Sequence, residues 1–177
     1  MAMLVVFGGL PGTGKTTLAR LVADRIGATY LRIDTIEQAL RSSMALADDV
    51  GPAGYVVACA ICETNLALGR VVVADCVNPL SITRAAWRDV AARTAAQIFE
   101  VEVICSDEAE HRRRVESREI DIPGLIPPTW AAVMARDYEP WSDPTMVVDT
   151  AHRTTAEAVL AIVDAIRRRS SGLSNVS

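Results

Sequence analysis

Residues 3–17, MLVVFGGLPGTGKTT, decide the fold, because an apolar run leads directly into a glycine-rich loop. The run Met3–Phe7 does not alternate in polarity, which is typical of a short strand in the middle of a parallel sheet. The segment Gly9–Thr16 then matches G-x-x-x-x-G-K-[ST], whose glycines let successive backbone N–H groups converge on an anion. An amphipathic helix is expected from Lys15 to about Ile26, and its N-terminus adds the positive end of the helix dipole. The stretch therefore predicts a phosphate-binding loop made of Gly9, Leu10, Pro11, Gly12, Thr13, Gly14, Lys15, Thr16 and Thr17.

Two side chains of this loop have expected roles of their own. Lys15 supplies a positive charge for the β- and γ-phosphates of a nucleotide, and Thr16 offers its hydroxyl to Mg²⁺. No Asn-Lys-x-Asp segment, which would recognise guanine, is present in the sequence, and this favours ATP over GTP.

Composition limits the class of protein. Of the 177 residues, 50% are hydrophobic and 23% are charged, which predicts one globular domain over 1–169 and a flexible tail over 170–177. The net charge of -4 argues against a nucleic-acid partner. No apolar run approaches the roughly 20 residues of a membrane span, and no secretion signal precedes the glycine loop. We expect a cytoplasmic protein without a membrane partner, as a monomer or homodimer, in which Cys59 and Cys62 are packing residues.

Short apolar strands alternate with helices along the chain, which predicts a parallel sheet covered by helices on both faces. The five expected strands are Met3–Phe7, Thr29–Ile33, Val71–Ala74, Phe99–Cys105 and Thr145–Val148. Ligands in such folds bind at the carboxyl ends of the strands. The residues that follow each strand are therefore the candidates for chemistry.

Aspartates follow the second and third strands. Asp75 is expected on the Mg²⁺ side of a nucleotide site, although an aspartate also often ends a strand as a turn residue. Asp34 is placed to take the proton of an attacking hydroxyl, and it also fits the N-cap of a helix that starts at Thr35. Asn78, shortly after Asp75, either bonds a substrate or braces its turn.

An arginine-rich helix is expected from Asp107 to Arg118, followed by a loop with three prolines. Arg114 and Arg118 are four residues apart, so they share one helix face and could clamp phosphates. Alone, the run fits a solvated face paired with glutamates. In a chain with a phosphate-binding loop, the segment near 107–128 is interpreted as a lid.

These motifs together resemble the small P-loop kinases of the AAA_33/zeta-toxin-like group, near the gluconate, shikimate, adenylylsulfate, chloramphenicol and polynucleotide 5′-hydroxyl kinases. The resemblance covers about residues 3–150, and the phosphate-binding loop is its most specific part. It implies a three-layer α/β fold with sheet order 2-3-1-4-5 and ATP–Mg²⁺ as donor. It also implies Asp34 as the base, with Arg114 and Arg118 as lid residues.

The sequence departs from the group at one place. Several relatives carry Asp-x-x-Arg after the second strand, whereas this chain has Asp34-Thr-Ile-Glu37, with Arg41 one turn later. The missing cation favours a neutral or cationic small alcohol over a polyanionic acceptor. Residues expected to contact this acceptor are Asp34, Glu37, Arg41, Glu63 and Asn78.

The leading hypothesis is an ATP-dependent kinase that phosphorylates a small alcohol, with Lys15, Asp34, Arg114 and Arg118 as catalytic residues. A nucleotide or polynucleotide 5′-hydroxyl kinase is the first alternative, and it requires a basic acceptor channel. A nucleotide-binding regulatory ATPase without a small acceptor is the second.

Overall fold

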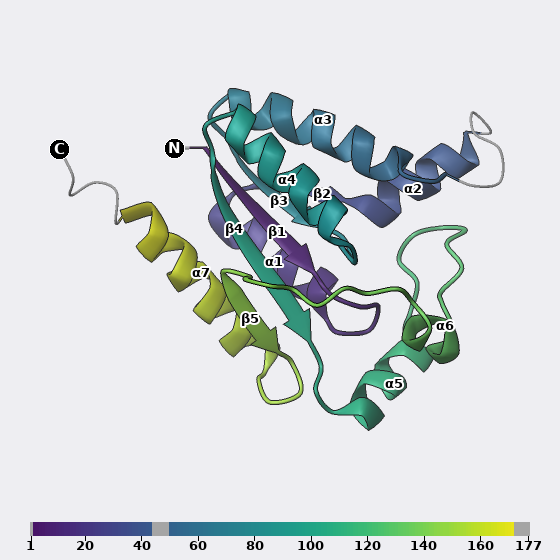
Figure 1. The fold of residues 1–177 in the computed structure, drawn as a ribbon. Coiled ribbons are helices and arrows are strands. Elements are labelled where there is room, and N and C mark those ends of the chain that lie inside the picture. The colour runs from purple at the N-terminus through teal and green to yellow at the C-terminus, as the bar shows by residue number, and fades with distance from the viewer. Residues whose placement is uncertain (1, 44–49, 172–177) are drawn as a thin grey trace.

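A computed structural model describes residues 2–43 and 50–171 of the chain (Figure 1). Its centre is a five-stranded sheet in which all strands are parallel, in the order β2-β3-β1-β4-β5. This confirms the predicted fold class and strand order. The strands are β1 (Met3–Gly8), β2 (Thr29–Arg32), β3 (Val71–Asp75), β4 (Gln97–Ile104) and β5 (Met146–Asp149).

Strand β1 lies in the middle of the sheet and is buried along its whole length. It pairs with β3 on one side and β4 on the other, so that Val5 lies opposite both Val73 and Phe99. Both faces of this strand are buried, so side chains on both faces are apolar, which explains its continuous apolar sequence. The glycine loop therefore starts from the best-supported strand of the molecule.

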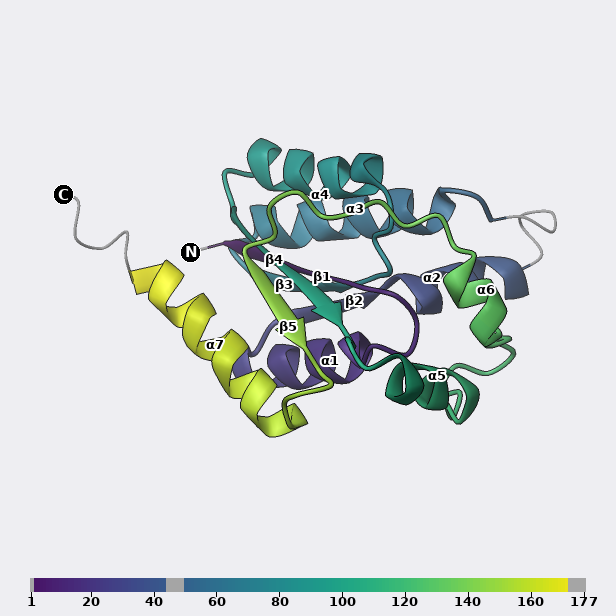
Figure 2. The same ribbon diagram turned by 60° about the horizontal axis from the view of Figure 1, so that its bottom comes forward.

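Helices cover both faces of the sheet, as Figure 2 shows. Residues of α1 and α7 pack in one core with Val5, and residues of α3 and α4 pack in the other with Leu4 and Val6. The shorter helices α5 and α6 lie beyond the carboxyl ends of the strands (Figures 1 and 2). The helices are α1 (Lys15–Ile26), α2 (Ile33–Ser42), α3 (Ala53–Ala67), α4 (Ser81–Arg93), α5 (Glu108–Glu116), α6 (Trp130–Met134) and α7 (Thr155–Ser171).

Several element boundaries differ from the sequence prediction, and two of these differences change the surroundings of Asp34 and Arg118. Strand β2 ends at Arg32 and α2 begins at Ile33, so Asp34 lies in the first helical turn and is not the N-cap. The buried side chain of Ile33 packs into the core at this point, which draws the chain directly from strand to helix. Helix α5 ends at Glu116, so Arg118 is not on a helix face shared with Arg114.

The remaining chain-wide expectations concern the cysteines, the tail and the membrane. Cys59 and Cys62 pack in α3, where burial raises the pKa of their thiols to about 11 and about 12. Helix α7 takes in Ser170 and Ser171, and the rest of the predicted tail lies outside the described residues. Within 2–43 and 50–171, every helix is too short or too polar to cross a membrane.

Candidate active site

The glycine loop turns between β1 and α1 in conformations that only glycine adopts readily. Gly12 and Gly14 have φ angles of 88° and 90°, in the left-handed region. A side chain on Gly12 would also collide with Val115 of α5, whose methyl carbon would lie 2.4 Å from the added Cβ. The loop is held from within, because the Thr13 hydroxyl donates to the carbonyl of Leu10 at 2.9 Å. These constraints fix the backbone that the sequence predicted to bind phosphate.

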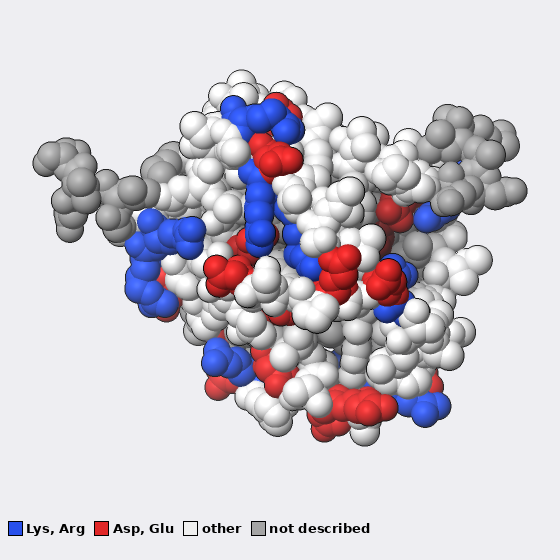
Figure 3. Space-filling model, in the orientation of Figure 1, with Lys and Arg blue, Asp and Glu red and all other residues white. Residues whose placement is uncertain are grey.

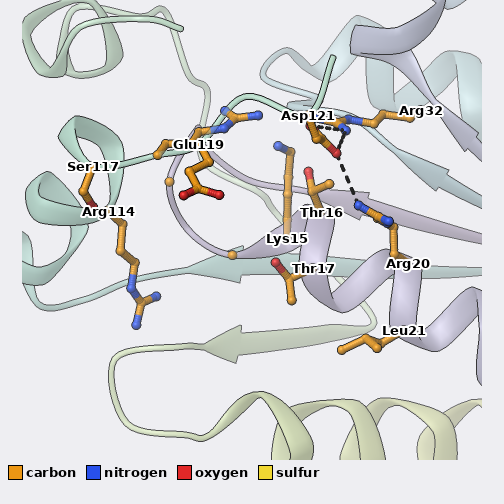
Figure 4. Close-up of a pocket in the computed structure, with 13 residues that line it drawn as sticks. Lys15, Thr16, Thr17, Arg20, Leu21, Arg32, Arg114, Ser117, Glu119 and Asp121 are labelled. Atoms are coloured by element: carbon orange, nitrogen blue, oxygen red, sulfur yellow. Dashed lines mark hydrogen bonds and ion pairs between the residues drawn. The ribbon is translucent and has the colours of Figure 1, made fainter. Parts of the chain in front are cut away.

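A cavity of about 620 Å³ opens in front of this loop (Figure 4). Its walls come from the loop, from α1, from the end of β2 and from the segment after α5. We call it the donor cavity. It is lined by Gly12, Gly14, Lys15, Thr16, Thr17, Arg20, Leu21, Arg32, Arg114, Ser117, Arg118, Glu119 and Asp121.

Asp75 lies buried at the end of β3, beside the donor cavity. Its Oδ1 is 4.0 Å from Nζ of Lys15 and accepts no hydrogen bond from the described residues. Its Oδ2 accepts a hydrogen bond of 2.7 Å from the Tyr30 hydroxyl. The tyrosine thus holds one carboxylate oxygen, while the other has no hydrogen-bond partner among the described residues.

This arrangement fits a Mg²⁺–nucleotide complex. Magnesium is commonly held by one or two protein oxygen ligands together with phosphates and water. The unpartnered Oδ1 of Asp75 and the Thr16 hydroxyl in the cavity wall provide such oxygens. In the described parts of the chain, no cluster of three or more His, Cys, Asp or Glu residues forms a separate metal cage. The donor set is therefore one that depends on the phosphates of a bound nucleotide.

Arg32 connects the carboxylates around the donor cavity, and sequence reasoning missed it. The side chain is buried, yet its Nη2 lies 3.7 Å from Asp34 and its Nε 3.8 Å from Asp75. Its Nη1 donates to both carboxylate oxygens of Asp121, at 2.9 and 2.8 Å. Asp121 also accepts a bond of 3.2 Å from Arg20 of α1 (Figure 4). The segment after α5 is thereby attached to the mouth of the donor cavity.

A second cavity, of about 390 Å³, adjoins the first on the side of α2. Asp34 lines it from the first turn of α2, 28% exposed, and we call it the acceptor cavity. Lys15 and Arg118 line both cavities. The acceptor cavity is lined by Pro11, Lys15, Ile33, Asp34, Glu37, Gln38, Arg41, Tyr55, Val77, Pro79, Arg118, Gly124, Leu125, Ile126, Pro128 and Arg136.

Glu37 and Arg41, two of the residues expected to contact the acceptor, both line the acceptor cavity. They also pair with each other, with Nη2 of Arg41 at 3.3 Å from the Glu37 carboxylate. Burial raises the pKa of Glu37, the charge of Arg41 acts to lower it, and nearby Asp34 acts to raise it further; the net shift is upward. The pair therefore presents little net charge to a ligand.

The two lid arginines have different surroundings. Arg114 donates to Glu110 at 2.7 Å and to the Thr150 hydroxyl at 2.8 Å. In Figure 4 its guanidinium points away from Lys15. Arg118 follows the end of α5, in the wall between the two cavities. Arg114 thus attaches α5 to Thr150, the residue that follows β5. Arg118 is available to a ligand.

Two predicted acceptor contacts are not in the cavity. Glu63 lies far along α3, about 13 Å of helix rise beyond Gly54, and pairs with Arg93 of α4 at 2.9 Å. Asn78 is completely buried, and it is Val77 and Pro79 on either side that reach the cavity. Its backbone N–H donates to the Tyr55 hydroxyl at 3.0 Å, while its buried side-chain amide has no hydrogen-bond partner among the described residues.

His111 is another residue that the sequence did not single out. Its Nε2 donates to the carbonyl of Pro11 at 2.8 Å, and its ring meets Trp130 of α6 edge-on at 5.1 Å. The histidine thus joins α5 and α6 to the glycine loop. No local pattern signals such a role, since its partners lie far away in the sequence.

The parallel sheet of order 2-3-1-4-5 with a phosphate-binding loop at its central strand defines the P-loop kinase fold. The chain belongs to the AAA_33 family, an AAA domain, which matches residues 4–123. No curated protein sequence matches the chain.

Solved structures share this fold over almost the whole chain. A putative kinase from Chloroflexus aurantiacus J-10-fl is 16% identical, with a TM-score of 0.73 and coverage of 97% of each chain. A gluconokinase from Sinorhizobium meliloti 1021 is 18% identical, with a TM-score of 0.66 over 96% of this chain and 94% of its own. The Mycobacterium tuberculosis APS kinase in complex with AMPPNP and APS is 20% identical, with a TM-score of 0.64 over 94% and 98%. At these identities the likeness establishes the fold.

Proposed function

We propose that the protein is an ATP-dependent kinase that transfers the γ-phosphoryl group to a hydroxyl of a small molecule. The observation that carries this proposal is that the donor and acceptor cavities adjoin and share Lys15 and Arg118. A phosphoryl group bound between them would have cationic groups beside it and a carboxylate, Asp34, on the acceptor side. The kinase names of the structural neighbours agree with this reading.

Each of these residues has its own role in the proposed phosphoryl transfer. The acceptor hydroxyl attacks the γ-phosphorus, its O–P bond forms as the bond to the β–γ bridging oxygen breaks, and ADP leaves. Asp34 takes the hydroxyl proton as general base. Lys15 and Arg118 stabilise the charge on the transferring group. Arg114 orients the lid through Glu110 and Thr150. When bound with the nucleotide, Mg²⁺ would neutralise phosphate charge beside Thr16 and Asp75.

The replacement Asp34→Asn tests the assignment of the base. The amide has nearly the same shape but cannot accept the proton, so phosphate-ester formation from a pool of small alcohols should fall at least about a hundredfold. ATP affinity, measured by calorimetry, should stay within about twofold because Asp34 lines only the acceptor cavity. Equal turnover in the variant and the wild type would remove Asp34 from the mechanism.

The replacement Lys15→Ala is the matching test on the donor side. Lys15 lines both cavities, so both ATP affinity and the rate of transfer should drop. If neither changed, the glycine loop would not be the nucleotide site.

A further inference from the structure

The charges around the acceptor cavity do not balance. Its wall holds four cationic side chains and two carboxylates. Both carboxylates have cations of their own, since Glu37 pairs with Arg41 at 3.3 Å and Asp34 lies 3.7 Å from Arg32. Lys15 lies 4.0 Å from Asp75. That leaves Arg118 and Arg136 with no carboxylate within 4.0 Å in the part of the chain that the structure describes.

The two remaining arginines differ in what they can reach. Arg118 lines the donor cavity as well, so a bound nucleotide would engage it. Arg136, just after α6, lines the acceptor cavity and not the donor cavity. Its charge acts on Glu37 across the cavity, where it lowers the pKa of that carboxyl against the larger effect of burial. An arginine in this place suits an anionic group on the acceptor, because its planar fork matches carboxylate and phosphate oxygens.

Much of the rest of the wall is apolar. Ile33, Tyr55 and Val77 contribute from the body of the protein, and Leu125 and Ile126 from the lid. Ile126 is 88% exposed, which leaves a large apolar side chain of the lid available for contact with a ligand. Small-molecule sites commonly combine such walls with a few polar groups that fix orientation.

From these features we propose that the acceptor is an alcohol with an apolar body and an anionic group, a carboxylate or a phosphate, held by Arg136. This rests on the proposed function, because it names the acceptor class of the same site. It reverses the expectation of a neutral or cationic acceptor, which came from Glu37 in the place of an arginine. The chain supplies the cation instead from the segment after α6, which folding brings opposite α2.

The test is a panel of small alcohols in equal shares of carboxylate-bearing, phosphate-bearing, neutral and cationic members, incubated with the full-length protein and ATP–Mg²⁺. Mass spectrometry of each new phosphate ester identifies the acceptors. We expect the best acceptors, ranked by kcat/KM, among the anionic members. The carboxylate and phosphate shares tell which anion Arg136 binds.

Arg136→Gln should lower kcat/KM for the best anionic acceptor about tenfold or more, the loss expected for a charge-assisted hydrogen bond. The kcat/KM for an uncharged analogue of this acceptor, and the affinity for ATP, should be unaffected. Arg136→Glu should abolish the preference for anions. Arg25→Gln is the matched control, since Arg25 is an exposed arginine at the far end of α1.

Best acceptors that are neutral or cationic, or an Arg136→Gln protein with unchanged kcat/KM for anions, would overturn this inference and leave the kinase proposal standing. An absence of phosphate ester from every class, with ATP bound, would contradict the proposed function itself and this inference with it.

Discussion

Two side chains, Tyr30 and Arg32, surround one carboxylate oxygen of Asp75, the residue that we propose lies beside Mg²⁺. Tyr30 donates to Oδ2 of Asp75 at 2.7 Å, and Arg32 lies 3.8 Å from the same oxygen. Burial, together with the charge of Asp75, raises the pKa of Tyr30, so this hydroxyl remains a donor across the physiological range. The other oxygen of Asp75 accepts no hydrogen bond from the described residues and lies 4.0 Å from Nζ of Lys15, which lines the donor cavity.

The replacement Tyr30→Phe should weaken the effect of Mg²⁺ on nucleotide binding. Removing the hydroxyl frees the Asp75 carboxylate to rotate, and partners of this kind typically change metal affinity by about tenfold. Calorimetry of ATP with and without Mg²⁺ measures the effect, and affinity in the absence of the metal should not change. Tyr138→Phe, which removes a hydroxyl bonded to Glu102, is the matched control. An unchanged Mg²⁺ dependence in Tyr30→Phe would show that Tyr30 has no such role.

Among single residues, the sequence predicted those that belong to a local pattern. It missed those whose contacts form only when distant segments fold together. Lys15 and Thr16 follow from the glycine pattern, and Asp75 from its place after a strand. Arg32 ends β2 and would have been found by the same rule, but the strand was expected to extend to Ile33. Asp121 and Arg136 carry no local signal, because Asp121 pairs with Arg32 and the charge of Arg136 acts on Glu37, and both of those residues are distant in the sequence.

Among the elements, the segment near 107–128, which the sequence predicts to be a lid, is attached to the rest of the protein at both ends of α5. At the glycine loop, His111 bonds to Pro11. Beyond the helix, Asp121 pairs with Arg32 and Arg20. The second attachment is partly exposed and ionic, so it is the easier one to break. We therefore expect the segment around Asp121 to open while α5 remains in place.

The replacement Asp121→Asn should speed opening of the lid. The amide keeps the size of the side chain but loses the ion pairs, so limited proteolysis by trypsin at Arg118 should become several-fold faster. The free energy of unfolding should change by less than about 1 kcal/mol, because the aspartate is partly exposed. Asp143→Asn, in another loop, is the control. Equal cleavage rates in the two variants would argue against an Asp121 attachment.

The same attachment has a predictable pH dependence. Burial acts to raise the pKa of Asp121, but the hydrogen bond and charge of Arg32 outweigh it and hold the pKa below its usual range. The ion pair is therefore present above the ordinary carboxyl pKa of about 4 and is lost as pH falls through the lower, folded-state value. Protection of the segment around Arg118 can be measured by hydrogen exchange or by cleavage with an acid-active protease. This protection should be constant from about pH 8 to 5. Loss of protection within that window would contradict the assignment.

The start of α7 and the end of α5 show which helix boundaries can be predicted from the sequence. Thr154 and Glu157 at the start of α7 bond reciprocally as a capping box, a pattern that can be recognised in the sequence because both partners are close together. The end of α5 at Glu116 was not expected, since the arginine pattern continues to Arg118. Where the chain leaves that helix depends on contacts such as Asp121 with Arg32, which sequence spacing does not reveal.

At the scale of the whole molecule, the sheet order follows from the alternation of strands and helices, while the relation of the two cavities does not. The acceptor cavity takes its walls from the glycine loop, α2, the turn after β3 and the lid. These segments come together only in the folded chain. Its charge balance, from which we infer the class of acceptor, therefore could not be predicted from the sequence pattern at Asp34 and Glu37.

Charge on the surface is consistent with a small acceptor rather than a polymer. Figure 3 shows acidic and basic side chains intermixed on this face of the molecule. A nucleic-acid acceptor would instead favour a continuous basic track, and its affinity would fall steeply with salt.

We propose that Lys15 and Asp34 face one transfer site, so that the γ-phosphoryl group goes to an alcohol and not to water. The most direct measurement follows the label of [γ-³²P]ATP, with and without the alcohol panel. We expect label in organic phosphate esters, which should depend on the panel and be lost in Asp34→Asn. Label found only in inorganic phosphate, at a rate that no alcohol alters, would contradict it and indicate a nucleotide-hydrolysing regulator.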